Sequence, residues 1–161
     1  MQLLLIRHAD AGEHDPSLWP DDTLRPLTDK GRRRHRRVAK QLRKRGLVPT
    51  LLLASPWLRA WQTAVITTEF ARGPAPLASP ALAEAPHLGR LASAIGSAGD
   101  DAVVALVGHE PWLGHLASLL LAGDPTGLAI DFPKSGVLGL ELAEVKAGAA
   151  HLRFFWRPKG G

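Results

Sequence analysis

The chain has 161 residues, of which 45% are hydrophobic and 22% charged, and this composition excludes a disordered or fibrous protein. The formal charge of +5 at pH 7 fits an anionic partner, whether a phosphorylated small molecule, a phosphoprotein, a nucleic acid or an acidic membrane. Because cysteine is absent, disulfide scaffolds, thiolate zinc sites and a cysteine nucleophile are excluded.

The length predicts a single domain covering residues 1–161. No apolar run reaches the roughly 18 residues that a membrane-spanning helix needs. The N-terminal apolar stretch also lacks the preceding charged region of a secretory signal. We therefore expect a cytoplasmic protein without a membrane partner, while its oligomeric state is left open.

The first predicted strand, Gln2 to Ile6, is an almost unbroken apolar run, as in strands that are buried on both faces. It ends abruptly at Arg7 and His8, so polar side chains follow directly at its carboxyl end. Residues 11–27 contain a glycine, three prolines and several acids, which predicts a long irregular loop. Loops of this length often carry function.

A helix is predicted next, from the N-cap Thr28 to about Arg45, with Gly46 as its stop signal. One of its faces is largely apolar, and the rest is densely basic. The residues expected on the buried face are His35, Val38, Ala39 and Leu42. A run from Arg32 to Arg45 invites a nucleic-acid interpretation, but the helix has no aromatics for stacking, so we expect a solvated face.

The middle of the chain repeats the pattern of a buried strand followed by polar residues. Residues 51–54 form the second predicted strand, and Ser55 with Pro56 is expected to begin a helix that runs to about Phe70. Residues 73–86 are predicted to be a loop with a short extended piece at 80–82, followed by a helix over 88–97.

The third predicted strand spans residues 102–107, and Gly108 and His109 lead from it into a helix that ends near Gly123. Two late strands are expected at 137–142 and 151–156. Strands that alternate with helices predict an α/β protein, a three-layer α/β/α sandwich with a mainly parallel central sheet. Ligands of such folds bind beyond the carboxyl ends of the strands, where the polar segments at 7–8, 55–59 and 108–109 would meet.

Two arginines and two histidines at one strand edge suit phosphoryl transfer, which is assisted by cations and N–H donors that face the phosphate oxygens. His8 could be the nucleophile if its second ring nitrogen donates to a backbone carbonyl, and Arg7 would lie beside it. Arg59, one turn into its helix, and His109, which could bind as a cation, would hold the phosphate. These four are the predicted catalytic residues, and Arg7, Arg59 and His109 are the predicted substrate-binding residues.

Three segments carry a resemblance to a known family. LIRHA at 5–9, SPWLRAWQTA at 55–64 and VGHEP at 107–111 resemble the histidine phosphatase superfamily, which is phosphoglycerate mutase-like in fold. The short layout, with RPLT at 25–28 and Gly31, is similar to its phosphohistidine phosphatase branch. The resemblance covers nearly the whole chain and implies a phosphohistidine intermediate on His8, with neither metal nor organic cofactor.

The resemblance leaves the general acid open between Glu84 and Glu110. Glu84 is the possible proton donor, with a solvent-facing role equally open, whereas an acid at position 110 is better explained by the start of a helix. A phosphorylated histidine has a labile P–N bond and a leaving nitrogen that protonates easily, so its hydrolysis can proceed without a strong acid.

The favoured function is removal of phosphate from a phosphohistidine on a protein. A small-molecule phosphomonoesterase acting on a sugar phosphate or nucleotide is the alternative enzyme. From another class, the chain could be a non-catalytic phosphate-recognising adaptor, although such a module needs no nucleophile. A metal enzyme built from His8, Asp10 and His14 is a further alternative.

Overall fold

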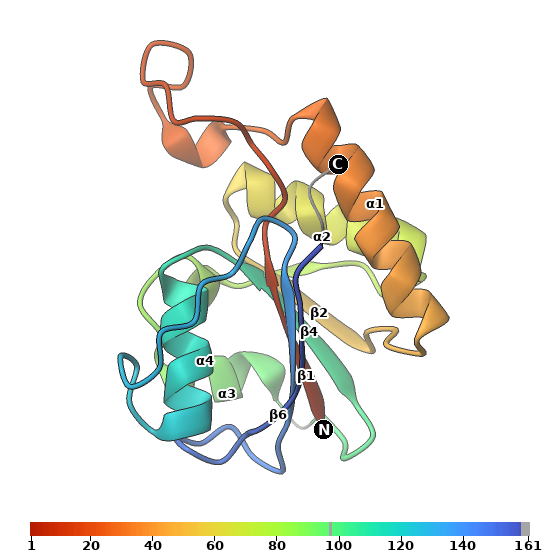
Figure 1. The fold of residues 1–161 in the computed structure, drawn as a ribbon, viewed down its shortest axis with the longest axis vertical. Helices are drawn as coiled ribbons and strands as arrows, with labels where there is room; N and C mark the ends of the chain where they lie inside the picture. The colour runs from red at the N-terminus through yellow and green to blue at the C-terminus, as the bar shows by residue number, and fades with distance from the viewer. Residues whose placement is uncertain (97, 159–161) are drawn as a thin grey trace.

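The computed structural model describes residues 1–96 and 98–158, and a six-stranded sheet crosses the middle of this part of the chain (Figure 1). The strand order is β3-β2-β4-β1-β5-β6. The first four strands of this order run parallel, whereas β5 is antiparallel to β1 and β6 is antiparallel to β5. The strands are β1 (Gln2–Arg7), β2 (Leu51–Ala54), β3 (Leu77–Ala78), β4 (Val103–Gly108), β5 (Val137–Glu141) and β6 (His151–Trp156).

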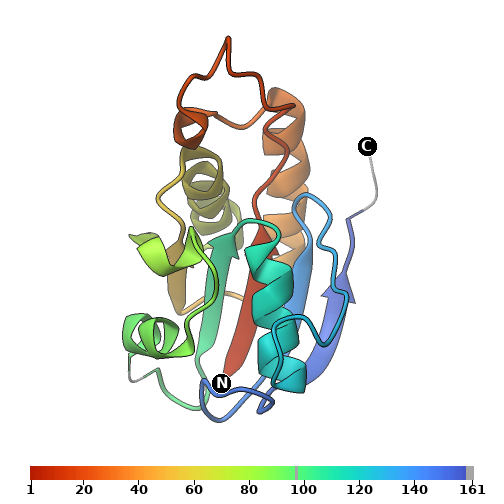
Figure 2. The same cartoon turned by 90° about the vertical axis from the view of Figure 1, so that its left-hand side faces the viewer.

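Helices cover both faces of the sheet, with α1 and α2 on one face and α3 and α4 on the other (Figures 1 and 2). The expected three-layer α/β/α sandwich with a mainly parallel sheet is thereby confirmed. The helices are α1 (Asp29–Lys44), α2 (Leu58–Ala71), α3 (Leu88–Ile95) and α4 (Trp112–Ala122), with short 3-10 helices at η1 (Asp22–Leu24) and η2 (Pro80–Leu82).

The apolar run of β1 supplies both halves of the core. Leu4 and Ile6 pack with buried residues of α1 and α2, whereas Leu3 and Leu5 pack with buried residues of α3 and α4. All four side chains are essentially inaccessible to solvent. Alternation along a strand sends neighbouring side chains to opposite faces, so a continuous apolar run is what a strand between two helical layers requires.

The predicted limits of α1 agree closely with the structure. The Thr28 hydroxyl accepts a hydrogen bond from the Gly31 N–H at 3.0 Å, which caps the first turn. Gly46 has a φ of +72°, the left-handed conformation that ends a helix. At Gly31 a Cβ atom would lie 2.2 Å from the carbonyl oxygen of Asp10, so only glycine lets the helix start approach the loop after β1.

Two local predictions were wrong, and a third agrees with the structure except at its end. Helix α2 begins at Leu58 and not at Ser55, whose hydroxyl contacts the His109 ring and accepts from the Trp57 N–H at 3.3 Å. The short extended piece lies at Leu77–Ala78, where it pairs with β2, while residues 80–82 form a 3-10 helix. Helix α3 ends at Ile95, and the predicted last residue, Ser97, lies outside the described residues.

The carboxyl ends of β1, β2 and β4 lie side by side at one edge of the sheet. Because β5 runs antiparallel to β1, the residues just before β5 reach the same edge. Four separate chain segments therefore meet there. Among the described residues, no helix is long and apolar enough to cross a membrane.

Candidate active site

The two candidate catalytic histidines lie next to each other because their strands are paired in register. Arg7 of β1 pairs with Gly108 of β4, and the His8 N–H donates to the Gly108 carbonyl at 3.0 Å. His8 and His109 each directly follow one of these residues, and their ring centroids are 5.1 Å apart. The predicted meeting of these segments is thus observed.

The His8 ring is oriented by a backbone carbonyl. Its Nδ1 lies 2.7 Å from the carbonyl oxygen of Ala9, which can only accept, so Nδ1 carries the proton and Nε2 keeps its lone pair. The side chain is buried, and burial is the main cause that lowers the pKa of His8 to about 2. His8 is therefore neutral at physiological pH, with Nε2 available as a nucleophile.

His109 is held by the residue that follows β2. Its Nε2 lies 2.8 Å from the Ser55 hydroxyl, and its ring packs against Trp57 with a centroid distance of 4.7 Å. Burial, followed by the charge of Arg59, lowers the pKa of His109 to about 3. His109 is therefore neutral in the protein alone, and a bound phosphate dianion would favour the cationic form that the sequence analysis considered.

Arg59 projects from the first turn of α2 and is 5% exposed. Its Nη2 lies 3.1 Å from the Asp22 carboxylate, and its Nη1 donates to the Asp22 carbonyl at 2.8 Å. The guanidinium also lies 4.7 Å from the centre of the Trp57 ring. These contacts fix the fork of Arg59 and tie the long loop of residues 11–27 to the site.

Arg7 is placed through a short chain of hydrogen bonds. Its Nη1 donates to the Phe132 carbonyl at 2.5 Å, and the Phe132 N–H donates to the Glu110 carboxylate at 2.7 Å. The second carboxylate oxygen of Glu110 accepts from the Gly114 N–H in α4 at 3.0 Å. This contact supports the helix-start interpretation of Glu110, because both oxygens are occupied by backbone donors.

Sequence reasoning missed Lys134 as a residue beside the candidate site. The segment before β5 crosses the end of β1, where the Ser135 N–H donates to the His8 carbonyl at 3.3 Å. Lys134 is half-buried there, and burial followed by the charge of Arg7 lowers its pKa. Knowing that β5 runs antiparallel to β1 would have indicated that the residues before β5 lie beside His8. The sequence does not reveal the direction of β5.

A buried threonine links the nucleophile loop to the arginine of α2. The Thr63 hydroxyl accepts from the Ala9 N–H at 3.0 Å and donates to the Arg59 carbonyl at 2.7 Å. Thr63 is fully buried, so this contact is shielded from water. It holds the backbone after His8 at a fixed distance from the start of α2.

His35 extends this network to α1. Its Nε2 lies 2.9 Å from the Thr67 hydroxyl, and its Nδ1 lies 3.1 Å from the Ser135 hydroxyl. The Thr67 hydroxyl donates to the Thr63 carbonyl at 3.0 Å, so it accepts from Nε2–H of His35, and the Ser135 hydroxyl donates to Nδ1. Burial lowers the pKa of His35 to about 3, in agreement with this neutral form.

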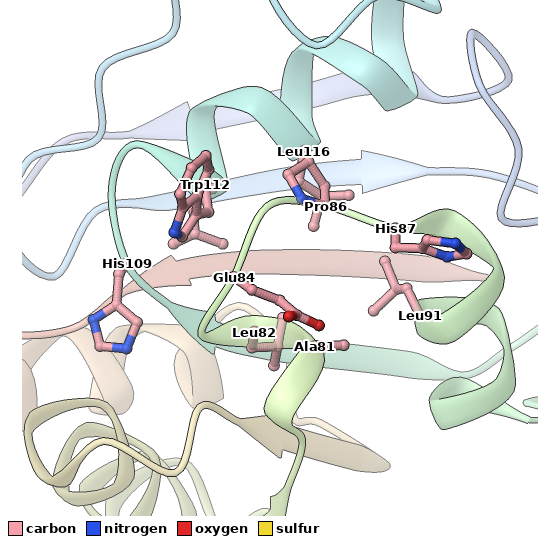
Figure 3. A pocket seen from close by; sticks show the side chains of 10 residues that line it. Ala81, Leu82, Glu84, Pro86, His87, Leu91, His109, Trp112 and Leu116 are labelled. Atoms are coloured by element: carbon pink, nitrogen blue, oxygen red, sulfur yellow. The ribbon is translucent and has the colours of Figure 1, made fainter. Parts of the chain in front are cut away.

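Glu84 lines a pocket that His109 also lines. Its side chain is 47% exposed and pairs with Arg90, with a distance of 2.5 Å between Oε1 and Nη1. Figure 3 shows the carboxylate turned towards Ala81 and Leu91, while the His109 ring lies at the opposite end of that pocket. A second pocket, of about 390 Å³, lies beside Arg7 and Glu110.

Unpartnered nitrogens, including the Nε–H donors of two arginines, gather at the candidate site. Within residues 1–96 and 98–158, four buried side-chain nitrogens have no hydrogen-bond partner, and three of them are Nε of Arg7, Nε of Arg59 and Nδ1 of His109. A buried donor without a partner is costly, which favours a ligand rich in acceptor oxygens. A phosphoryl group has this chemistry.

The metal alternative finds no support in the geometry. Asp10 accepts from the Thr28 hydroxyl at 3.0 Å, and His14 lies 3.8 Å from Asp22 with a side chain that is 57% exposed. In the described part of the chain, no three His, Asp or Glu side chains are grouped so that they could hold a metal ion. His8, Asp10 and His14 therefore do not form the site that the metal alternative needs.

Comparison with known proteins now adds the family. The model of the histidine phosphatase superfamily (branch 1) matches residues 3–92. The chain belongs to the histidine phosphatase superfamily. An uncharacterized protein of Picosynechococcus is 37% identical over 155 residues, which cover 95% of this chain and 89% of that relative.

Solved structures place this histidine phosphatase among enzymes with different substrates. The protein histidine phosphatase SixA, complexed with tungstate, is 25% identical, with a TM-score of 0.82 and coverage of 98% of this chain and 97% of that one. A mycobacterial glucosyl-3-phosphoglycerate phosphatase is 18% identical, with a TM-score of 0.70 and coverage of 98% and 99%, a likeness in fold alone. Superfamily membership and the likeness to SixA support a phosphatase activity, and the substrate is not thereby identified.

Proposed function

We propose that the protein is a phosphohistidine phosphatase that removes phosphate from a histidine of a protein through a phosphohistidine intermediate on His8. The observation that carries the proposal is the state of His8, whose Nδ1 is bonded to the Ala9 carbonyl at 2.7 Å while Nε2 is left neutral. The unpartnered nitrogens of Arg7, Arg59 and His109 support a phosphate pocket around it.

In the first step, the Nε2 lone pair of His8 attacks phosphorus and forms a new P–N bond. The P–N bond of the substrate breaks, and its electron pair goes to the substrate imidazole, which takes a proton from water. Charge on the transferred oxygens is stabilised by Arg7 and Arg59, which are already fixed by Phe132 and Asp22 and need little reorganisation.

In the second step, water attacks the phosphohistidine at position 8. The P–Nε2 bond breaks, the water loses its proton to solvent, and inorganic phosphate leaves with His8 neutral again. The Ala9 carbonyl stabilises the His8 ring while its Nδ1–H carries more positive charge. Neither step is assigned a carboxylic acid of this chain.

The carboxylates near the site favour phosphohistidine over a phosphomonoester as the substrate, because each candidate acid already has a partner. Glu110 is occupied by two backbone donors, Asp22 by Arg25 and Arg59, and Glu84 by Arg90. An alkoxide leaving group needs a positioned acid, whereas an imidazole is basic enough to be protonated by water. The likeness to SixA also supports this choice.

The small-molecule phosphomonoesterase remains the second candidate because of the pocket of about 390 Å³ beside Arg7, which has room for the organic part of a small phosphate ester. A substrate panel separates the two candidates. We expect kcat/KM to be highest on phosphohistidine proteins, whereas a preference for a sugar phosphate or nucleotide would favour the second candidate.

The nucleophile is tested by trapping. The protein is mixed with a ³²P-phosphohistidine protein and quenched in alkali, and we expect an acid-labile label on the wild-type chain. His8→Ala should lose the label and about 10⁴-fold or more in turnover, while His151→Ala, at an exposed histidine, should retain both. Full activity of His8→Ala would refute the mechanism, and binding of the phosphohistidine protein with neither label nor turnover would favour the adaptor alternative.

A further inference from the structure

Charge is divided unevenly between one helix and the rest of the chain. Residues 29–45 contain ten of the 20 Lys and Arg residues and one of the 15 Asp and Glu residues. This segment therefore has a formal charge of +9, and the remainder of the chain, with ten basic and 14 acidic residues, has −4. The positive net charge thus arises from α1 together with its C-cap Arg45.

The cations of α1 have no acidic partners among the residues that the structure describes. The ion pairs among residues 1–96 and 98–158 use none of its lysines or arginines. Like charges three or four residues apart destabilise a helix, and an ordinary solvated helix face offsets them with interleaved acids. Here the offset is missing, so an external anion would relieve the repulsion.

The exposed surface of α1 is basic without being apolar. Seven of its cations and the C-cap Arg45 are exposed, and the seven are Lys30, Arg33, Arg36, Arg37, Lys40, Arg43 and Lys44. Arg36 and Lys40 lie over the ring of Phe70, at 5.5 and 5.3 Å, and Arg45 lies 5.3 Å from the ring of Trp156. The neighbouring aromatics are therefore engaged by cations and are not presented for stacking.

The basic face begins at the candidate active site. The Thr28 N–H donates to the Asp10 carbonyl at 3.0 Å, which ties the start of α1 to the residue two positions after His8. From there α1 runs along the outside of the sandwich (Figures 1 and 2). Lys30, Arg33 and Arg37 line a hollow of about 240 Å³ on its first three turns.

We propose that the exposed basic face of α1 binds an acidic surface of the phosphorylated protein while its phosphohistidine occupies the pocket at His8. This proposal rests on the proposed function and adds the kind of substrate that the enzyme selects. Sixteen helical residues span about 24 Å. About seven residues of an extended acidic segment would match that length.

The charge distribution favours a protein over a nucleic acid. A nucleic acid is negative along its whole length and would extend from α1 across the remainder of the surface, where the net charge is −4. An acidic patch the size of one helix meets only the basic face. The absence of exposed aromatics on α1 also removes the stacking on which single-stranded nucleic acids depend.

The test compares two phosphohistidine peptides of about 20 residues that differ only in one segment, which holds seven glutamates in the first and seven glutamines in the second. The variant is Arg33→Gln/Arg37→Gln, at two exposed residues of the hollow. The matched control is Lys146→Gln/Arg153→Gln, which removes the same charge from exposed sites paired with Glu144 and Glu141. Free phosphohistidine serves as the substrate without a docking segment.

We expect the wild type and the control to prefer the glutamate peptide in kcat/KM by about tenfold at low salt, and to lose the preference near 0.5 M NaCl. The variant should lose most of the preference through a higher KM, with kcat and the rate on free phosphohistidine within about twofold of wild type. This result separates docking from damage to the pocket.

The docking proposal would be overturned if the wild type had equal kcat/KM on both peptides, or if the variant preferred the glutamate peptide as strongly as the wild type does. Hydrolysis of the peptides would still support the proposed function in either case. No hydrolysis of either peptide or of free phosphohistidine would instead reject the proposed function. A duplex oligonucleotide is added as a competitor. The proposal would be overturned, and the basic face assigned to nucleic acid, if the oligonucleotide inhibited the wild type but not the variant while the wild type showed no preference between the peptides.

Discussion

The protein uses its positive charge in two contrasting ways. Arg7 and Arg59, in the candidate pocket, are held by a carbonyl and a carboxylate, and Arg59 is 5% exposed. The cations on the outer face of α1 are exposed and have no acidic partner in the described chain. Fixed, dehydrated charge can stabilise a transition state, whereas mobile, hydrated charge acts at longer range and is screened by salt.

The histidines also divide into a buried group and an exposed group. His8, His35 and His109 are buried, and burial lowers their pKa values to about 2, 3 and 3. His14 and His151, by contrast, are exposed. Substitutions matched in chemistry but opposite in burial therefore test whether the location of an ionisable group decides its role.

The largest contrast is expected between two arginines. Arg59→Ala should lower kcat/KM on phosphohistidine by about 10²- to 10³-fold, because a preorganised donor to the transferred oxygens is lost. Arg90→Ala removes an exposed arginine whose partner is Glu84, and it should stay within about twofold of wild type. Steady-state kinetics on one substrate compares them directly.

Arg59→Lys sharpens this contrast. A lysine retains the charge but lacks the planar fork, so it should recover only part of the lost activity. If Arg59→Ala were as active as Arg90→Ala, the buried position would have no catalytic consequence, and the assignment of Arg59 to the phosphate pocket would be wrong.

The second contrast concerns buried and exposed histidines. His35 resists protonation in the folded state but not in the unfolded state, so between pH 6.5 and about 3 the unfolded chain binds more protons. Stability is therefore complete above pH 6.5 and declines as pH falls. For a group with a folded pKa of about 3, the loss between pH 7 and pH 5 is about 2 kcal/mol.

Urea unfolding at pH 7 and pH 5 measures this loss. His35→Gln removes the titrating group but keeps a donor and an acceptor for Thr67 and Ser135, so its pH dependence should be smaller than that of wild type. His151→Gln, at an exposed site, should match wild type. An unchanged pH dependence in His35→Gln would show that His35 is not one of the groups that resist protonation in the folded state.

Local sequence signals were sufficient for the framework of the molecule. The apolar run before Arg7, the Thr28 cap and the glycine stop at Gly46 act within a few residues, and each corresponds to an observed element. The meeting of Arg7, His8, Arg59 and His109 also followed, since parallel strands bring their carboxyl ends to one edge.

Contacts between distant segments could not be predicted. Ser55 has the chemistry of a helix cap, but its hydroxyl contacts His109, 54 residues later, and α2 begins three residues further on. Asp22 belongs to a loop of no regular pattern, yet it fixes Arg59. The charge state of His109 also depends on how many neighbours bury it, and the sequence does not contain that information.

The smallest effect is expected at an exposed carboxylate. Glu84→Gln should change kcat/KM on phosphohistidine by less than about threefold, because the Glu84 side chain is 47% exposed, pairs with Arg90, and exposed pairs contribute little. Glu144→Gln, at an exposed carboxylate paired with Lys146, is the matched control. Both variants are assayed on phosphohistidine and on an alkyl phosphate.

The alkyl phosphate makes this small effect informative, because its leaving group requires a proton and an imidazole does not. A large loss in Glu84→Gln on the alkyl phosphate alone would identify Glu84 as an acid that phosphohistidine hydrolysis bypasses. A hundredfold loss on phosphohistidine would contradict the prediction. The ion pair between Glu84 and Arg90 would then have to open during turnover. An exposed charge would in that case act in catalysis, which the contrast between buried and exposed charges does not predict.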